Sequence, residues 1–258
     1  MARRTQWGVV LSPVEFDLLW DDLGLGESPY PLDVPSHGAT MVERAELAAA
    51  ALAALADVGL VGGADGEDLD AELLENLVLL RHNTLSVDAL VFGDRPRRAL
   101  AAAGDERAVL AVLDGDDLAI EPVHRDRVVH AVMSVIGDAR PGPGEQVRLP
   151  RAAYSAAMDG YARTGYPGFE RALVTSGVQG RAIRPLATMV ESRRTASGQL
   201  AATGPEGRSP VLSWFDTEAG RYAASTEDGG AEPWVTITPA DGALIARRLT
   251  ELIGGVAG

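Results

Sequence analysis

Residues 85–123, LSVDALVFGDRPRRALAAAGDERAVLAVLDGDDLAIEPV, decide the fold of this chain. From Leu85 onward, apolar residues recur at every second position, which is the period of a strand. The pairs Gly93-Asp94 and Asp114-Gly115 are typical of hairpin turns, and such short connections join antiparallel neighbours. We therefore expect four antiparallel strands, at Leu85–Phe92, Arg97–Ala103, Arg107–Leu113 and Leu118–Val123.

The third of these strands is apolar throughout Ala108–Leu113, so we expect it to be the central strand of the sheet. After the fourth strand the period changes to that of a helix, with an apolar stripe made of Val129, Val132, Met133 and Ile136.

The segments before residue 85 predict one strand and three helices. Thr5–Leu11 has the composition of a strand, and Ser12-Pro13-Val14-Glu15 then has the N-cap, proline and glutamate of a capping box. Thr40 and Glu43 form a second such pair, which opens an alanine-rich helix that ends near Asp57. A shorter helix is expected at residues 69–80.

The same order of elements returns after a proline- and glycine-rich break at residues 140–145. Arg107–Gly115 aligns with Arg221–Gly229 at an offset of 114 residues, which indicates an internal duplication. We predict a single α+β domain, 1–258, with a pseudo-twofold repeat of the form β-helices-ββββ-α, whose quasi-repeats 5–137 and 146–254 are joined by a linker, 138–145. The second repeat is expected to contain a strand at 146–149, helices at 150–163, 169–176 and 183–195, strands at 198–203, 211–215, 221–226 and 234–238, and a helix at 239–253.

Composition excludes several classes of function. The formal net charge of −14 repels a phosphate backbone, so no nucleic-acid partner is expected. There is no cysteine, which removes disulfides, thiolate nucleophiles and zinc–thiolate sites. All 23 basic residues are arginine, which removes a Walker A lysine and a Schiff-base lysine.

No membrane insertion is expected either. The most apolar stretch, Leu47–Leu60, has about fourteen residues, where a spanning helix needs about 20. The N-terminal residues lack the apolar run of a secretory signal before Ser12, so the expected location is cytoplasmic.

Motifs for catalysis and for metal or cofactor binding were sought among the remaining residues. His124 and His130 are six residues apart, which places them on different faces of a helix. No GxSxG or GxGxxG motif is present, and the acidic run at 65–72 lacks the ligand order of an EF-hand. One hydrolase alternative stays open, in which His37 acts with Ser36 or a neighbouring aspartate. By exclusion, we expect a binding module with no catalytic residue, metal or cofactor.

The best candidate recognition charges are Arg97, Arg98 and Arg107, which fall near the ends of predicted strands. A guanidinium keeps its charge and can fork onto a carboxylate, which suits a binding surface. The alternative is a solvated strand face with no partner.

The string LSPVEFDLLWDDLGLGESPYPLDVPSHGATMVERAEL at 11–47 resembles the N-terminal signature of the EspG family, the cytosolic chaperones of ESX (type VII) secretion in actinobacteria. The resemblance continues through residues 95–115, the Pro-Gly linker, residues 169–173, Gly198-Gln199-Leu200, LSWFDTEAGRY at 212–222 and WVTITPADGALIARRLTELI at 234–253.

The resemblance implies a central antiparallel sheet flanked by helical bundles and related by a quasi-twofold axis. It also implies a non-catalytic activity, which is to bind a PE/PPE-type heterodimer at its apolar helical tip and to keep it soluble for export. A WXG100-like or other helical-hairpin client is the fallback, and a homo-oligomeric scaffold or homodimer is the alternative.

Within that family reading, we expect the partner to be bound by the hairpin around Phe92, Arg97 and Arg98. The helices at 152–162 and 183–195 are expected to line the same groove, because they present apolar faces beside accessible arginines.

Overall fold

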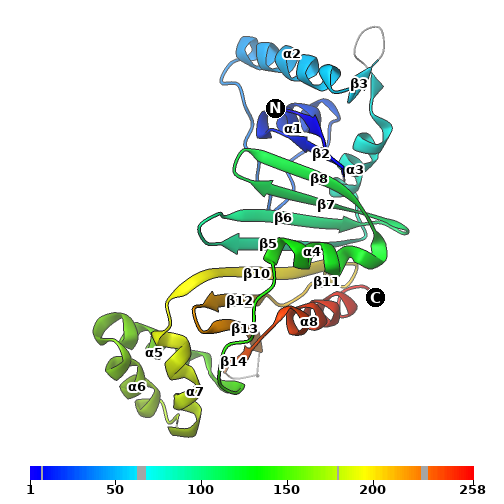
Figure 1. Ribbon diagram of the computed structural model, residues 1–258. Helices are drawn as coiled ribbons and strands as arrows, with labels where there is room; N and C mark the ends of the chain where they lie inside the picture. The colour runs from blue at the N-terminus through cyan, green and yellow to red at the C-terminus, as the bar shows by residue number, and fades with distance from the viewer. Residues whose placement is uncertain (7, 63–67, 179, 228–231) are drawn as a thin grey trace.

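The computed structural model describes residues 1–6, 8–62, 68–178, 180–227 and 232–258. Within these ranges, twelve strands form one long sheet in the order β1-β2-β8-β7-β6-β5-β10-β12-β13-β14-β9, with β11 paired to β10 (Figure 1). The strands of this sheet are β1 (Arg3–Arg4), β2 (Val9–Leu11), β5 (Leu85–Phe92), β6 (Arg97–Ala103), β7 (Arg107–Asp114), β8 (Asp117–His124), β9 (Val147–Pro150), β10 (Arg194–Gly204), β11 (Gly207–Arg208), β12 (Leu212–Thr217), β13 (Gly220–Glu227) and β14 (Trp234–Pro239).

The helices and a small second sheet complete the fold. The short strands β3 (Val61–Gly62) and β4 (Asp68–Leu69) pair only with each other in the described chain. The helices are α1 (Pro13–Asp22), α2 (Met41–Asp57), α3 (Ala71–Arg81), the 3₁₀ turn η1 (Arg125–Arg127), α4 (Val128–Ile136), α5 (Arg151–Thr164), α6 (Tyr166–Thr175), α7 (Gly180–Glu191) and α8 (Gly242–Gly254).

The two halves of the long sheet have the same strand order. From the outer edge inward, the first half runs β2-β8-β7-β6-β5 and the second half runs β9-β14-β13-β12-β10. In each half the earliest of these strands is outermost, the last strand lies beside it, and the remaining strands follow in reverse chain order toward the middle of the sheet. The halves meet at the antiparallel pair β5–β10, where Ser197 faces Phe92 at one end and Thr203 faces Ser86 at the other. Every strand pair in this sheet is antiparallel, as predicted.

Helices cover both faces of the sheet, because alternate residues of each strand point to opposite sides. On one face, α4 and α8 pack against residues such as Ala99 and Ala101. On the other face, α1 and α3 pack against the sheet in a cluster with Leu100 and Ala102, and α2 packs on α1. The helices α5–α7 cover the far end of the sheet through Phe215 (Figure 1). The molecule is therefore long, and its exposed surface of 13,561 Å² exceeds the ~10,800 Å² expected of a compact chain of this mass.

The strands predicted at Leu85–Phe92 and Arg97–Ala103 are confirmed to the residue. The prediction that Ala108–Leu113 forms the central strand is wrong, because β5 and β10 lie at the middle of the sheet and β7 lies inside its first half. The continuous apolar run has another cause: β7 is buried on both faces, with Leu110 under α4 and Val109 under α1 and α3.

Several other boundaries differ from the expectations, and two of the differences have a visible cause. The predicted strand Thr5–Leu11 is divided, because Thr5 and Gly8 close a turn between β1 and β2. The helix predicted at 183–195 ends at Glu191, and Arg194 already pairs with Thr217 as the first residue of β10. The apolar spacing of these residues predicted a helix, but their pairing with β12 makes them part of the sheet. Gly229 of the internal alignment lies outside the described residues.

The N-terminal caps follow the sequence closely. Ser12 accepts a hydrogen bond from the Glu15 amide while the Glu15 carboxylate accepts one from the Ser12 amide, which is a full capping box. At α2, Thr40 caps the Glu43 amide, but the Glu43 carboxylate accepts from the Ala39 amide instead. In the described chain, no helix is both long and apolar enough to cross a membrane.

Asp70 joins the N-terminal strand to α3 and gives a test with a defined pH dependence. Its carboxylate caps the Leu73 amide and forms an ion pair with Arg4 at 2.7 Å. The Arg4 hydrogen bond, followed by that of Leu73, lowers the pKa of Asp70 below its ordinary value of 3.8. Asp70→Ala is therefore expected to lower the free energy of unfolding by about 1–2 kcal/mol at pH 7.

The sign of the pH dependence follows from the lowered pKa. The stabilisation by the Asp70 carboxylate is present above pH 3.8 and is lost as the pH falls through the pKa of the folded state. Urea unfolding of the wild type and of Asp70→Ala at several pH values measures it, with Asp70→Asn as the uncharged cap control. A difference between wild type and Asp70→Ala that grows toward acid pH would contradict this role.

Candidate binding groove

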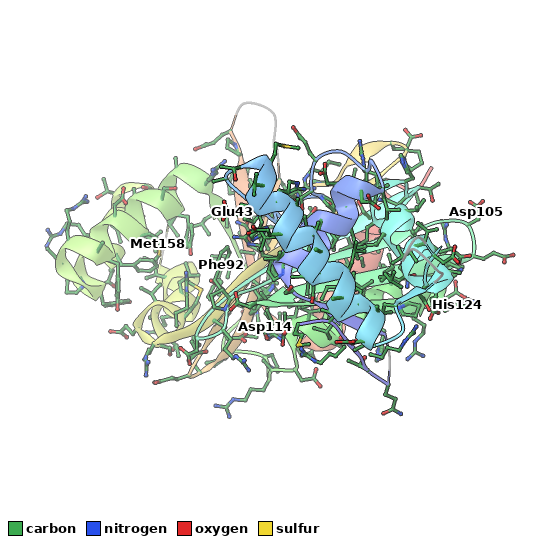
Figure 2. All side chains as sticks on the ribbon, turned by 90° about the horizontal axis from the view of Figure 1, so that it is seen from above. Glu43, Phe92, Asp105, Asp114, His124 and Met158 are labelled. Carbon is green, nitrogen blue, oxygen red and sulfur yellow. The ribbon has the colours of Figure 1, made fainter. Side chains whose placement is uncertain are left out.

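A groove lies on the sheet face that carries α1–α3 at one end and α5–α7 at the other. We call it the central groove; it has a volume of about 740 Å³. Its floor is formed by β10 and β12, one wall is the start of α5, and Phe92 stands at the end of β5. In the view of Figure 2, Phe92 lies below Glu43 of α2 and to the right of Met158 of α5. Its lining includes Phe92, Arg151, Tyr154, Ser155, Arg194, Ser197, Gln199, Val211, Ser213 and Phe215.

The floor stays uncovered because its side chains are small or polar. Ser197, Gln199 and Ser213 face the groove, whereas their strand neighbours Leu200 and Trp214 point to the opposite face and pack under the helices there. A floor of hydroxyl and amide groups gives a helix no apolar surface to bury. The sequence of β10 and β12 thus produces a covered face and an open one.

Two large apolar side chains remain exposed at the groove. Phe92 is 50% exposed and Val211 is 40% exposed, although both belong to or adjoin the central strands of the sheet. An exposed aromatic ring beside a concave, partly polar surface is typical of a protein–protein contact.

Two arginines give the groove its charge. Arg194 lies with its guanidinium 4.5 Å from the centre of the Phe215 ring, and Arg151 is the first residue of α5. Both side chains line the groove, and neither forms an ion pair with another described residue. Burial raises the pKa of the Tyr154 hydroxyl, and the positive charge of Arg194 opposes that rise.

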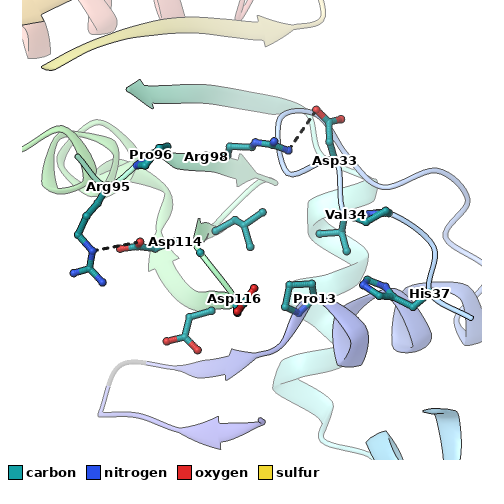
Figure 3. A pocket seen from close by; sticks show the side chains of 13 residues that line it. Pro13, Asp33, Val34, His37, Arg95, Pro96, Arg98, Asp114 and Asp116 are labelled. Carbon is teal, nitrogen blue, oxygen red and sulfur yellow. Dashed lines mark ion pairs between the residues drawn. The ribbon is translucent and has the colours of Figure 1, made fainter. Parts of the chain in front are cut away.

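A second cavity, of about 890 Å³, lies on the same sheet face, next to the turn between β7 and β8. Figure 3 shows its arginines facing aspartates, with Arg98 near Asp33 and Arg95 near Asp114. Arg98 also donates a hydrogen bond to the carbonyl oxygen of Leu32 at 3.1 Å. The positive charges of this cavity are therefore matched within the chain.

The structure does not bring the three predicted partner-binding residues together in one site. Phe92 lines the central groove, while Arg98 lines the second cavity on the same face. Arg97 precedes Arg98 in the same strand and so points to the opposite face, where its Nε atom is buried without a hydrogen-bond partner among the described residues. Arg107 lies at the other end of β6–β7, beside Glu75 of α3.

Sequence reasoning missed Arg151, Tyr154 and Arg194 as groove residues. The signal for Tyr154 was available, because the predicted helix at 152–162 was expected to line a groove. Arg194 had been assigned to the end of a helix, and only the pairing of Arg194 with Thr217 places it at the groove.

The residues of the hydrolase alternative serve a structural network. The Asp17 carboxylate accepts hydrogen bonds from the His37 amide at 2.7 Å and from Arg44 at 3.0 Å, and His37 Nδ1 lies 3.4 Å from it. The Ser36 hydroxyl accepts a hydrogen bond from Arg44 at 3.2 Å, so Arg44 joins Asp17, Ser36 and His37 in one network. Among the described residues no group of three potential ligands is arranged around a metal site, and Asp65 and Glu67 of the acidic run lie outside those residues.

An antiparallel sheet flanked by helices, with an open, partly apolar groove on one face, defines the structural class of this protein. Comparison with known proteins identifies the class further: the chain belongs to the EspG family, whose family model matches residues 12–251. No curated protein matches the sequence.

Among solved structures, the chain is similar to one in the structure of the Mycobacterium tuberculosis type VII secretion system chaperone EspG5 in complex with a PE25-PPE41 dimer. The two chains share 17% sequence identity over 96% of each, with a TM-score of 0.72. At this identity the similarity establishes a common fold.

Proposed function

We propose that this chain is a non-catalytic, cytosolic chaperone that binds the apolar tip of a helical type VII secretion substrate of the PE/PPE kind. The observation that carries the proposal is the half-exposed Phe92 at an open groove in a chain of the EspG family. The complex formed by EspG5 with PE25-PPE41 supports the choice of client. A client whose apolar tip is covered stays soluble, and the complex is stabilised by mass action.

In this proposal the client tip lies in the central groove, with Phe92 as its apolar anchor and α5 as one wall. Arg98 lies at the edge of the site, in the second cavity on the same face. Arg97 is its neighbour in β6 and lies on the opposite face of the hairpin. The helix α7 contributes through the fold, since Ile183, Leu186 and Met189 pack into the core beneath α5 and α6.

We also propose that the two halves of the chain are pseudo-twofold repeats, 5–137 and 146–254, joined by the linker 138–145. The equal strand order on the two sides of the β5–β10 pair supports this relation, as does the matching position of α4 and α8 on one face. The aligned segments Arg107–Gly115 and Arg221–Gly229 correspond to β7 and β13.

The test of the chaperone function is co-expression with a PE/PPE pair encoded by the same genome. We expect the pair to move from the insoluble to the soluble fraction and to elute with this chain as one complex, with the mass of the pair added to 27.0 kDa. Size-exclusion chromatography with light scattering measures it. A client that stays insoluble while this chain elutes alone as a dimer would instead support the homo-oligomeric scaffold. A client of another helical-hairpin class, such as a WXG100-like protein, is tested in the same way.

A further inference from the structure

The central groove is lined by positive charge in a negatively charged protein. The chain carries a net charge of −14, yet Arg151 and Arg194 line the groove and no aspartate or glutamate is among its described lining residues. Two other arginines on the same sheet face lie beside a carboxylate of the chain itself. Arg208 pairs with Asp88 at 2.5 Å, and Arg98 lies near Asp33.

From this contrast we infer that the client segment that enters the central groove carries a carboxylate, which Arg151 and Arg194 bind. The inference rests on the proposed function and adds the chemistry of the recognised segment. A guanidinium that is not paired within its own chain is free to fork onto a carboxylate of a partner.

The geometry of Arg194 suits this role. Its guanidinium stacks 4.5 Å from the centre of the Phe215 ring, and the residue as a whole remains exposed. Stacking fixes the plane of the guanidinium and leaves its edges, which carry the N–H donors, available to a ligand. The orientation of the arginine is thus set before a partner arrives, and less side-chain entropy is lost on binding.

The remaining lining residues define the rest of the ligand. Ser155, Ser197 and Ser213 place hydroxyl groups along the groove, and these can donate to a carboxylate or to backbone carbonyl groups. Phe92 and Val211 supply apolar surface beside them. The occupant that matches this lining is a helix tip in which an apolar side chain and an acidic one are neighbours.

Synthetic helical hairpins test the inference directly. Three disulfide-closed hairpin peptides share one leucine-rich tip and differ in a single tip residue, which is Glu, Gln or Lys. Fluorescence anisotropy at about 50 mM salt is expected to show the Glu hairpin binding about tenfold more tightly than the Gln hairpin, with the Lys hairpin weakest. Raising the salt should reduce the difference, because exposed charges are screened.

Variants of the protein locate the effect. Arg194→Gln and Arg151→Gln are each expected to reduce the preference for Glu over Gln several-fold. Arg163→Gln is the matched control, because Arg163 is an exposed arginine of α5 that does not line the groove.

The possible results separate the inference from the proposed function. Equal binding of the Glu and Gln hairpins, or a preference that survives in both variants, overturns the inference and leaves the chaperone function standing. Failure of all three hairpins to bind also overturns it, and the co-expression experiment then decides the chaperone function by itself.

Discussion

Replacement of Arg221 by alanine is expected to lower the free energy of unfolding by about 3–5 kcal/mol, which is the usual cost of removing one partner of a buried ion pair. Arg221 is 1% exposed and forms two hydrogen bonds with the Asp216 carboxylate, at 2.6 and 2.9 Å. It also donates to the carbonyl oxygen of Gly137 at 2.7 Å, and its guanidinium lies 4.6 Å from the centre of the Trp214 ring. Alanine would leave the Asp216 carboxylate without its counterion.

Urea unfolding followed by circular dichroism measures this loss. The control is Arg248→Ala, which removes an exposed ion pair with Glu251 on α8 and should change the free energy of unfolding by less than about 0.5 kcal/mol. A loss below about 1 kcal/mol for Arg221→Ala would show that the buried pair of Arg221 and Asp216 adds little to the stability of the fold.

The exchange Phe92→Asp is expected to weaken client binding at least about thirtyfold, because aromatic anchors supply a large share of the energy of a protein interface. The ring is half exposed at the end of β5, so its removal leaves the core clusters intact. An aspartate at this position would also oppose an acidic client segment. The purified PE/PPE pair and biolayer interferometry give the dissociation constants.

Val174→Asp is the matched control for Phe92→Asp. Val174 is a 60% exposed apolar residue of α6, and it does not line the central groove. An equal loss of binding in both variants would place the client elsewhere, and wild-type affinity in Phe92→Asp would remove Phe92 from the interface. An unchanged melting temperature in both variants shows that the fold has been kept.

Local patterns in the sequence predicted much of the fold because the interactions they report are themselves local. The strand period from Leu85 to Phe92 and the capping box of Ser12 and Glu15 depend on residues a few positions apart. The pairing of β5 with β10 joins residues more than 100 positions apart, and no local pattern specifies it. For this reason the most apolar strand was mistaken for the centre of the sheet.

The candidate site was harder to predict for the same reason. Phe92 was selected as part of the hairpin that carries Arg97 and Arg98, and the structure places it at the groove. Grouping it with Arg97 and Arg98 ignored the period of two, which already places adjacent strand residues on opposite faces. Arg194 became a groove residue only through its pairing with Thr217, which competes with the helical pattern before it.

The construction of the groove floor bears on how a client would leave. β10 is hydrogen-bonded to β5 and β12, and β12 to β10 and β13, so the floor has a neighbour on each side and cannot hinge open without breaking ladders. A floor held in this way is preorganised and binds without an ordering penalty, but its strands cannot move apart to release a client. A client held there would therefore be handed over by competition, when a downstream component of the export pathway binds the same helical tip more strongly.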